Sequence, residues 1–366
     1  MDSVVEITKE LVELNSENPP GKEIEVAKYI NDYLVDLKID SEVFEFERGR
    51  ANVVGCVGNG NGLMLNGHID TVPIGDRKLW SHGPDAEIIE GKLYGRGTTD
   101  MKGGVAAVLS ALSRSNLKRA KRRLLLVFVA DEEVNFAGSA WLLKNKMEIF
   151  KGTRHGVIAE PTDLKIQIAQ KGLIGIKLKF KGKAAHGSTP ELGNNAILKA
   201  TEFVNKLSAS AADLRTEDQL LGTGTINIGK IVGGTAENVV PEFCYVYIDR
   251  RIVPGETTTG AIKQIKNIVN EVDKNTEFEI EFARDAFRLS DKSEIVKLIR
   301  SVTAAEMIGA AGYTEAELYK KEAGIDCVVF GPGKKELSHK ASEYVAVENL
   351  KRASAIFEKL IEKWIA

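Results

Sequence analysis

Residues 62–70 read Gly-Leu-Met-Leu-Asn-Gly-His-Ile-Asp, a short apolar run that leads into a histidine and an aspartate. Similar apolar runs follow at residues 124–129, 156–159 and 327–330. Such runs, with no alternation of polar residues, are typical of strands buried on both faces of a sheet. A helical pattern at residues 105–112 lies between the first two runs. This alternation predicts an α/β domain with a mostly parallel sheet.

Each of these runs is followed by residues that can bind a metal ion. They are His68 and Asp70 after the first run, Asp131, Glu132 and Glu133 after the second, Glu160 after the third and His339 after the fourth. A further candidate, Asp100, lies in a glycine-rich loop at residues 95–104, which opens the helix at 105–112. Ligands of open α/β sheets bind beyond the carboxyl ends of the strands, so we expect these side chains to converge.

Taken singly, these residues have ordinary explanations. Asp100 can cap its helix, and Glu132 and Glu133 can be solvated charges. Taken together, the imidazole and carboxylate groups form a set suited to two zinc ions, with Asp100 as the bridge. Asp70 would then accept the second ring N–H of His68 and fix its tautomer. Of the adjacent Glu132 and Glu133, one would bind metal and the other would act as a general base.

The pattern of the sequence changes after about residue 171. Residues 174–181 alternate apolar side chains with glycine and lysine, which predicts a strand with one buried face. A helix, two strands, a second helix and a last strand follow, in the ferredoxin-like order β-α-β-β-α-β. We therefore predict a larger α/β domain of residues 1–170 and 284–366, with a ferredoxin-like α+β domain inserted at 171–283.

The composition excludes several other classes of protein. The chain has 366 residues, with 50 Lys and Arg against 52 Asp and Glu. This near-neutral balance argues against a nucleic-acid-binding protein, and the basic run at residues 118–123 is expected to be a solvated loop. No apolar run reaches the roughly 18–20 residues of a membrane span, and the N-terminus lacks the features of a signal peptide. The scattered Cys56, Cys244 and Cys327 form no CxxC pair, which favours a reducing cytoplasm.

Several motifs resemble one family in particular. Residues 66–73, Asn-Gly-His-Ile-Asp-Thr-Val-Pro, resemble the first signature of the M20 family of metallopeptidases and amidohydrolases. That group includes acetylornithine deacetylase, succinyl-diaminopimelate desuccinylase, aminoacylase-1 and carboxypeptidase G2. Residues 95–104 resemble its second signature, and residues 130–133, 159–161 and His339 resemble the rest. The resemblance extends in order over nearly the whole chain and includes the inserted domain.

The resemblance implies a role for each residue of the site. Asp100 would bridge two zinc ions, for which cobalt can substitute, and the peptide bond from Asp100 to Met101 would be cis. Glu133 and His339 would complete one metal position, and His68 and Glu160 would complete the other. Glu132 would be the general base, so the resemblance settles which of the two adjacent glutamates binds metal.

The inserted domain carries further matches to the family. His186, in the sequence Ala-His-Gly-Ser at 185–188, resembles a histidine that crosses a dimer interface and polarises the scissile carbonyl. Asn238 and Arg251 would hold the carboxylate of the substrate, a task that suits a planar guanidinium. The resemblance thus implies a homodimer formed through the inserted domain, which would also act as a lid. His82 and His155 have no role in this interpretation and are expected at the surface.

The function implied is metal-assisted hydrolysis of the amide bond of an N-acyl amino acid, with Glu132 as general base. A metal-dependent dipeptidase or carboxypeptidase is the alternative among enzymes. A binding or scaffold protein with the same fold is the alternative from another class. The sequence does not show which residues select the acyl group or the amino acid of the substrate. Arg251 implies only that the substrate carries a carboxylate.

Overall fold

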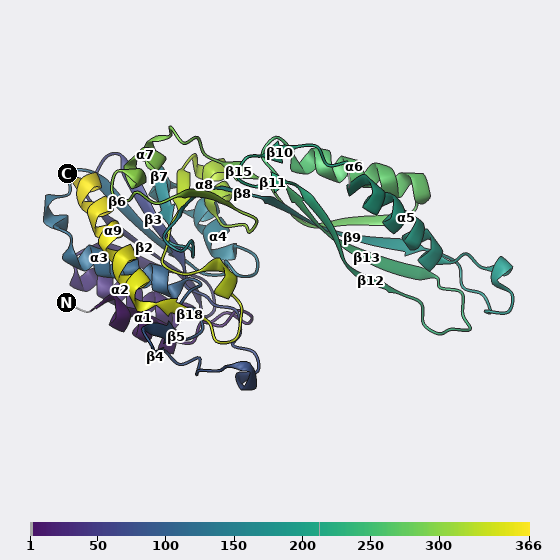
Figure 1. Cartoon of the computed structure of the whole chain (residues 1–366), viewed down its shortest axis with the longest axis horizontal. Helices are drawn as coiled ribbons and strands as arrows, with labels where there is room; N and C mark the ends of the chain where they lie inside the picture. The colour runs from purple at the N-terminus through teal and green to yellow at the C-terminus, as the bar shows by residue number, and fades with distance from the viewer. Residues whose placement is uncertain (1–2, 212) are drawn as a thin grey trace. The chain divides into compact units, whose positions relative to one another are not determined.

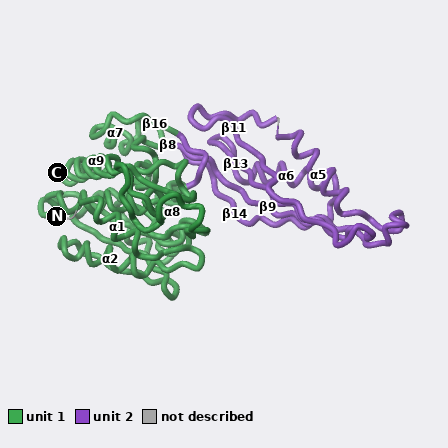
Figure 2. Tube along the Cα trace, turned by 60° about the horizontal axis from the view of Figure 1, so that its bottom comes forward, with its two compact units in different colours: residues 1–168, 289–308, 314–366 green, residues 169–288, 309–313 purple. Residues whose placement is uncertain are grey.

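The computed structural model describes residues 3–211 and 213–366 and divides into two compact units, which Figure 2 colours separately. Unit 1 comprises residues 1–168, 289–308 and 314–366, and unit 2 comprises residues 169–288 and 309–313. Met1 and Asp2, which belong to the N-terminus considered above, lie outside the described residues. None of the helices in the described part of the chain is long and apolar enough to cross a lipid bilayer.

The main sheet has the strand order β1-β2-β6-β3-β7-β17-β8-β15, and β16 pairs with β8. Its strands are β1 (Asp40–Glu47), β2 (Arg50–Val57), β3 (Gly62–His68), β6 (Arg123–Val129), β7 (Thr153–Ile158), β8 (Ile166–Gln170), β15 (Phe287–Arg288), β16 (Met307–Ala310) and β17 (Asp326–Val329). The central strands β6, β3, β7 and β17 are parallel, whereas β1, β2, β8 and β15 pair antiparallel. The predicted α/β class is confirmed, and the parallel order holds for the four strands that the apolar runs mark.

Helices cover both faces of this sheet (Figure 1). A Cβ at Gly67 would touch Met101, the N-cap of the helix α3 (Lys102–Arg114), and Val105 in its first turn. The side chain of neighbouring Asn66 instead bonds to Tyr319 of α8 (Ala316–Ala323). Successive residues of a strand point to opposite faces, so α3 and α8 lie on opposite sides. The helices of unit 1 are α1 (Val4–Glu13), α2 (Ile24–Asp36), α3 (Lys102–Arg114), α4 (Ala137–Asn145), α7 (Glu294–Arg300), α8 (Ala316–Ala323) and α9 (Val347–Ile365).

Helix α3 packs so closely on the end of β7 that only glycine fits at one contact. A Cβ at Gly104 would lie 1.9 Å from the carbonyl oxygen of Ala159. The close approach fixes the start of α3, and therefore the Asp100 loop before it, against the segment that carries Glu160. A small antiparallel sheet with the order β18-β5-β4 holds the chain just before this loop. Its strands are β4 (Glu87–Ile89), β5 (Lys92–Tyr94) and β18 (Tyr344–Ala346).

Unit 2 is a two-layer ferredoxin-like fold, as predicted. Its elements follow the order β9 (Gly172–Lys181), α5 (Ala196–Ala211), β12 (Thr225–Gly233), β13 (Phe243–Ile252), α6 (Thr258–Val272) and β14 (Glu277–Arg284). The antiparallel sheet has the order β12-β13-β9-β14, and a short hairpin of β10 (Glu217–Asp218) and β11 (Gly222–Thr223) precedes β12. Alternate residues of β9 such as Ile176, Leu178 and Phe180 are fully buried against Phe203 of α5 and Ile265 of α6. Unit 2 therefore has a hydrophobic core of its own.

Candidate metal centre

The parallel strands bring the predicted ligands of unit 1 together. β3 ends on His68, and the chain beyond β6, β7 and β17 supplies the other side chains of the cluster. These are Glu132 and Glu133 after β6, Glu160 after β7 and His339 after β17. Their convergence follows from the sheet, because the carboxyl ends of parallel strands lie along one edge.

His68 is fully buried and its ring is oriented by the backbone. Nδ1 lies 3.0 Å from the carbonyl oxygen of Asp70, and 3.5 Å from a carboxylate oxygen of the same residue. A carbonyl only accepts hydrogen bonds, so Nδ1 carries the proton and Nε2 is free to bind a metal. Nε2 lies 3.2 Å from Oδ1 of Asp100 and 3.5 Å from Oε1 of Glu160.

The Asp70 carboxylate mainly holds the turn after β6. It accepts hydrogen bonds from the backbone N–H groups of Glu132 and Glu133, each at 3.2 Å, and from Asn18 at 2.9 Å. The backbone carbonyl of Asp70 is thus the nearer partner of His68, whereas its side chain positions the two adjacent glutamates. The sequence predicts that the Asp70 carboxylate orients His68, and that carboxylate lies 3.5 Å from Nδ1, but its contacts with the turn after β6 were not foreseen.

Asp100 is placed by a loop that folds around a buried carboxylate. Oε1 of Glu343 accepts hydrogen bonds from the backbone N–H groups of Gly97, Thr99 and Asp100 at 3.1, 2.9 and 3.1 Å. Oε2 of Glu343 pairs with Arg96 at 2.6 Å. The peptide bond from Asp100 to Met101 is cis, as the family resemblance implied. No sequence signal distinguishes Glu343 from other glutamates, since its three donors are about 245 positions away in the chain.

His339 approaches the cluster from the loop after β17. Its Nε2 lies 2.8 Å from Oε2 of Glu133 and 3.5 Å from Oδ2 of Asp100. The side chain of His339 is half-exposed, whereas those of Glu133 and Asp100 are buried. Asp100 therefore faces His68 with one carboxylate oxygen and His339 with the other, which is the arrangement that a bridging ligand requires.

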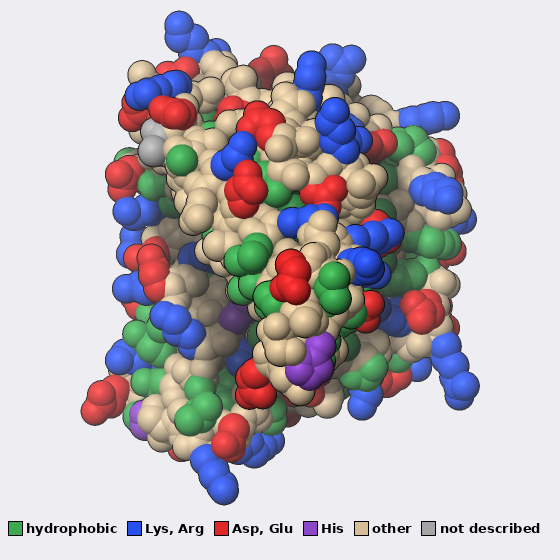
Figure 3. All heavy atoms as spheres, turned by 90° about the vertical axis from the view of Figure 1, so that its right-hand side faces the viewer, with side chains coloured by type: hydrophobic (Ala, Val, Ile, Leu, Met, Phe, Trp, Pro, Cys, Tyr) green, Lys and Arg blue, Asp and Glu red, His purple; other side chains and the backbone are tan. Residues whose placement is uncertain are grey.

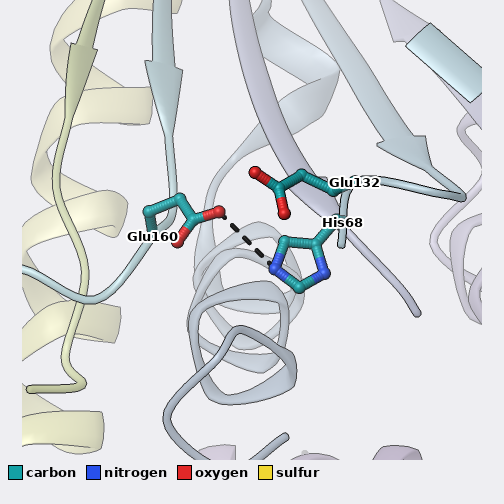
Figure 4. Close-up of side chains that lie close together, drawn as sticks. All are labelled: His68, Glu132 and Glu160. Carbon is teal, nitrogen blue, oxygen red and sulfur yellow. Dashed lines mark ion pairs between the residues drawn. The ribbon is translucent and has the colours of Figure 1, made fainter. Parts of the chain in front are cut away.

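Two overlapping groups of side chains have the spacing of a metal site. The ligand atoms of His68, Glu132 and Glu160 lie within 4.8 Å of one another, and so do those of His68, Asp100 and Glu133. Figure 4 shows the side chains of the first group pointing toward one another. Within the described residues, the buried oxygens Oδ2 of Asp100, Oε1 of Glu133 and Oε2 of Glu160 accept no hydrogen bond. Buried oxygens of this kind need a partner, and the donor set of imidazole and carboxylate fits zinc.

The charges in this cluster oppose one another. Burial, together with the nearby Glu160 carboxylate, raises the pKa of Glu132 well above its usual value. Burial and the Asp100 carboxylate likewise raise the pKa of Glu160 to about 8. Like charges placed together in a dry site disfavour ionisation, and divalent cations would remove that repulsion.

Lys335 is a cation at the cluster that the sequence interpretation missed. Its ammonium nitrogen lies 3.6 Å from Oδ2 of Asp100 and 3.7 Å from Oε2 of Glu160, two of the oxygens that accept no hydrogen bond in the described residues. The Lys335 side chain as a whole is about half-exposed. A lysine in a glycine-rich loop gave no signal by itself, because its position depends on how the loop returns toward Asp100.

In unit 2, the structure brings His186 and Asn238 together and separates them from Arg251. The backbone N–H of Gly187 donates to the carbonyl of Asn238 at 2.7 Å, just beyond the end where β9 and β13 pair through Lys181 and Phe243. Arg251 is paired with Leu173 at the other end of the same two strands. Arg251 follows Phe243 by eight positions in the strand, about 26 Å at the rise of an extended chain. Asn238 and Arg251 of one chain therefore cannot bind the same carboxylate.

The side chains of unit 2 suit the chemistry expected of them. The backbone N–H of Ser188 donates to Nδ1 of His186 at 3.1 Å, so a neutral ring carries its proton on Nε2. That leaves Nε2 as a hydrogen-bond donor on an exposed side chain. Arg251 forms a bidentate pair with Asp249, at 2.7 and 2.9 Å, whereas its neighbour Arg250 points into the core.

Comparison with known proteins agrees with this site. The model of peptidase family M20/M25/M40 matches residues 64–363. A protein of Staphylococcus aureus strain Mu50, named probable succinyl-diaminopimelate desuccinylase, is 30% identical over 96% of this chain and 97% of its own length. The acetylornithine deacetylase of Myxococcus xanthus is 31% identical over 83% of this chain and 81% of its own. The crystal structure of an M20-family metallo-carboxypeptidase from Sulfolobus solfataricus has the same fold, with a TM-score of 0.85, 19% identity and coverage of 100% and 99%.

The chain belongs to peptidase family M20/M25/M40. It is accordingly a metal-dependent hydrolase of amide bonds, and the resemblance drawn from its motifs is confirmed.

Proposed function

We propose that this chain removes the acyl group from an N-acyl amino acid, with two zinc ions held in unit 1. The convergence of His68, Asp100 and Glu160 around otherwise unbonded carboxylate oxygens is the observation that carries the proposal. The names of the Staphylococcus and Myxococcus relatives support a desuccinylase or deacetylase activity over a peptidase activity. When bound, the two ions would activate water and polarise the scissile carbonyl.

The ligands would divide between the two ions around Asp100. His68 and Glu160 would hold one ion, because Nε2 of His68 lies 3.2 Å from Oδ1 of Asp100 and 3.5 Å from Oε1 of Glu160. Glu133 and His339 would hold the other, because His339 lies beside Glu133 and Oδ2 of Asp100. Cobalt, which accepts the same nitrogen and oxygen ligands, would be able to replace zinc.

Glu132 would act as the general base. Its carboxylate belongs to the cluster around His68, and its backbone is fixed by the Asp70 side chain. A raised pKa suits a base that must take a proton from water and then give it to the leaving amine.

His186 and Asn238 would act on the substrate held by a second copy of the chain. They lie at one end of the unit 2 sheet and Arg251 lies at the other, so a small substrate that meets all three needs two chains. This geometry supports a homodimer in which Nε2–H of His186 donates to the developing oxyanion. Arg251, which pairs with Leu173 at the start of β9, would bind the substrate carboxylate in its own chain. The three free cysteines favour the cytoplasm as the compartment.

Substrate profiling of the zinc-loaded enzyme tests the reaction class. N-succinyl-diaminopimelate, N-acetylornithine, other N-acyl amino acids and a set of dipeptides would be compared by kcat/KM, with release of the free amine as the readout. We expect the acyl amino acids to be cleaved and the dipeptides to be poor substrates. Cleavage confined to dipeptides would assign the dipeptidase or carboxypeptidase activity, and metal retention without any cleavage would favour a binding protein.

A further inference from the structure

Unit 1 contains a cavity that lies far from the metal centre. It has a volume of about 910 Å³ and is bordered by the turn before β3, the starts of β6 and β7, helix α7 and the end of α9. The metal centre lies at the opposite, carboxyl ends of the parallel strands β3, β6 and β7. Strands of six or seven residues place the two sites about 20 Å apart.

The lining of this cavity is strongly basic. Its cations are Lys121, Arg122, Arg154, Lys297 and Lys363. The carboxylate in the lining belongs to Glu294, which already pairs with Nε2 of His155 at 3.0 Å. Among the described residues, none of the five cations has a carboxylate within ion-pair distance. Lys118, Arg119, Lys121 and Arg122 are exposed, as predicted for the basic run at residues 118–123, and two of them line this cavity with three cations from elsewhere.

This charge is local, because the chain as a whole is near neutral. On the face of the molecule drawn in Figure 3, Lys and Arg side chains are interspersed with Asp and Glu. Five exposed positive charges face the single carboxylate of Glu294 around this hollow, so they repel one another, and a concave surface concentrates their field. An anion bound in the cavity would relieve that repulsion.

The remaining lining residues indicate what kind of anion would fit. Asn59, Asn61 and Ser301 add polar groups, and the volume is in the range of small-ligand sites. Trp364 is 6% exposed, and the guanidinium of Arg122 lies 5.1 Å from the centre of its ring. The aromatic ring is therefore unavailable for stacking on a base, and recognition would depend on charge. The side chain of His155 is 15% exposed between Trp364 and Glu294, so it lies at the surface, as expected, but is mostly covered.

We propose that this cavity binds a small polyanion with several linked phosphate groups, the chemistry shared by inorganic tripolyphosphate and the triphosphate of a nucleotide. Arginine and lysine both bind phosphate oxygens, and arginine can do so through two parallel hydrogen bonds. Arg154 and Lys297 come from separate segments, the start of β7 and helix α7, and would contact the anion from two directions.

Isothermal titration calorimetry on the full chain tests this site, at constant ionic strength with tripolyphosphate and with ATP. The test variant is the double substitution Arg154→Gln and Lys297→Gln. The matched control is Lys118→Gln and Arg119→Gln, two exposed cations of the same basic run that do not line the cavity. We expect both probes to bind the wild type and the control alike, and the test variant to bind them about tenfold or more weakly.

Equal affinity for the two probes would assign recognition to the triphosphate, and tighter binding of ATP would add a contribution from the nucleoside to the same site. Thermal melting and zinc affinity of the test variant should match the wild type, which separates loss of the site from loss of the fold. The proposal is overturned if neither probe binds, or if the control pair weakens binding as much as the test pair. Tighter binding of a polyglutamate peptide than of tripolyphosphate would overturn it in favour of an acidic protein partner.

Discussion

The two units of the chain hold their predicted site residues in different ways. In unit 1, side chains that follow β6 and β7 and one that precedes α3 have ligand atoms within 4.8 Å of those of His68 at the end of β3. His339, which follows β17, lies beside Glu133 and Asp100. In unit 2, His186 and Asn238 lie at one end of a sheet and Arg251 at the other. A parallel sheet gathers its carboxyl ends at one edge, whereas antiparallel strands send successive ends to opposite edges. The comparison indicates that the strands of unit 1 bring a full set of metal ligands together within one chain, whereas the proposed substrate-binding residues of unit 2 stay apart in one chain.

Substitution of Glu132, the proposed general base, should have the largest effect. In Glu132→Gln, loss of the proton acceptor is expected to lower kcat by about 10²–10⁴-fold, while both zinc ions stay bound. Steady-state kinetics would measure the loss of kcat, and metal analysis of the same preparation would measure the zinc that stays bound. Glu148→Gln, at an exposed glutamate, is the control. Loss of zinc in step with activity would make Glu132 a ligand, and full activity would remove it from the mechanism.

Mixing two inactive variants tests the claim that unit 2 acts across a dimer. His186→Ala and Glu132→Gln would be co-expressed so that their chains pair at random. Each mixed dimer then holds one intact site, with Glu132 from one chain and His186 from the other. Since half of the dimers are mixed, about a quarter of wild-type activity should return. If His186 acts in its own chain, or if the protein sediments as a monomer, the mixture will be no more active than its parents.

The loop that carries Asp100 should depend on Glu343, a residue of unit 1 with no direct contact to substrate. Glu343→Ala removes the acceptor of three backbone N–H groups and is expected to weaken zinc binding by about 10–100-fold. Glu343→Gln keeps an acceptor oxygen but loses the charge that pairs with Arg96, so its effect should be smaller. Chelator competition would measure both. Unchanged zinc affinity in the alanine variant would show that the loop holds its shape without Glu343.

Sequence patterns predicted the two folds and the ligands of unit 1 because each of those signals is local. An apolar run marks a strand, and His68, Glu133 and Glu160 follow such runs by fixed short distances. Glu343 and Lys335 left no such signal, since their contacts are made by segments that are distant in the chain. The separation of Asn238 from Arg251 was also missed, because it depends on strand register and not on the motif around either residue.

Lys335 gives the smallest and most specific test of the unit 1 centre. Its ammonium nitrogen faces Oδ2 of Asp100 and Oε2 of Glu160, so its positive charge opposes the entry of divalent cations. In Lys335→Met, zinc should bind more tightly, by about fivefold to tenfold, because solvent screens a side chain that is half-exposed. Lys334→Met is the matched control, since that neighbour lies 3.9 Å from Asp163, away from the cluster. Zinc titration would compare the affinities of the two variants. If Lys335→Met binds zinc no more tightly than the control, the lysine does not oppose metal binding and instead holds the two carboxylates in place.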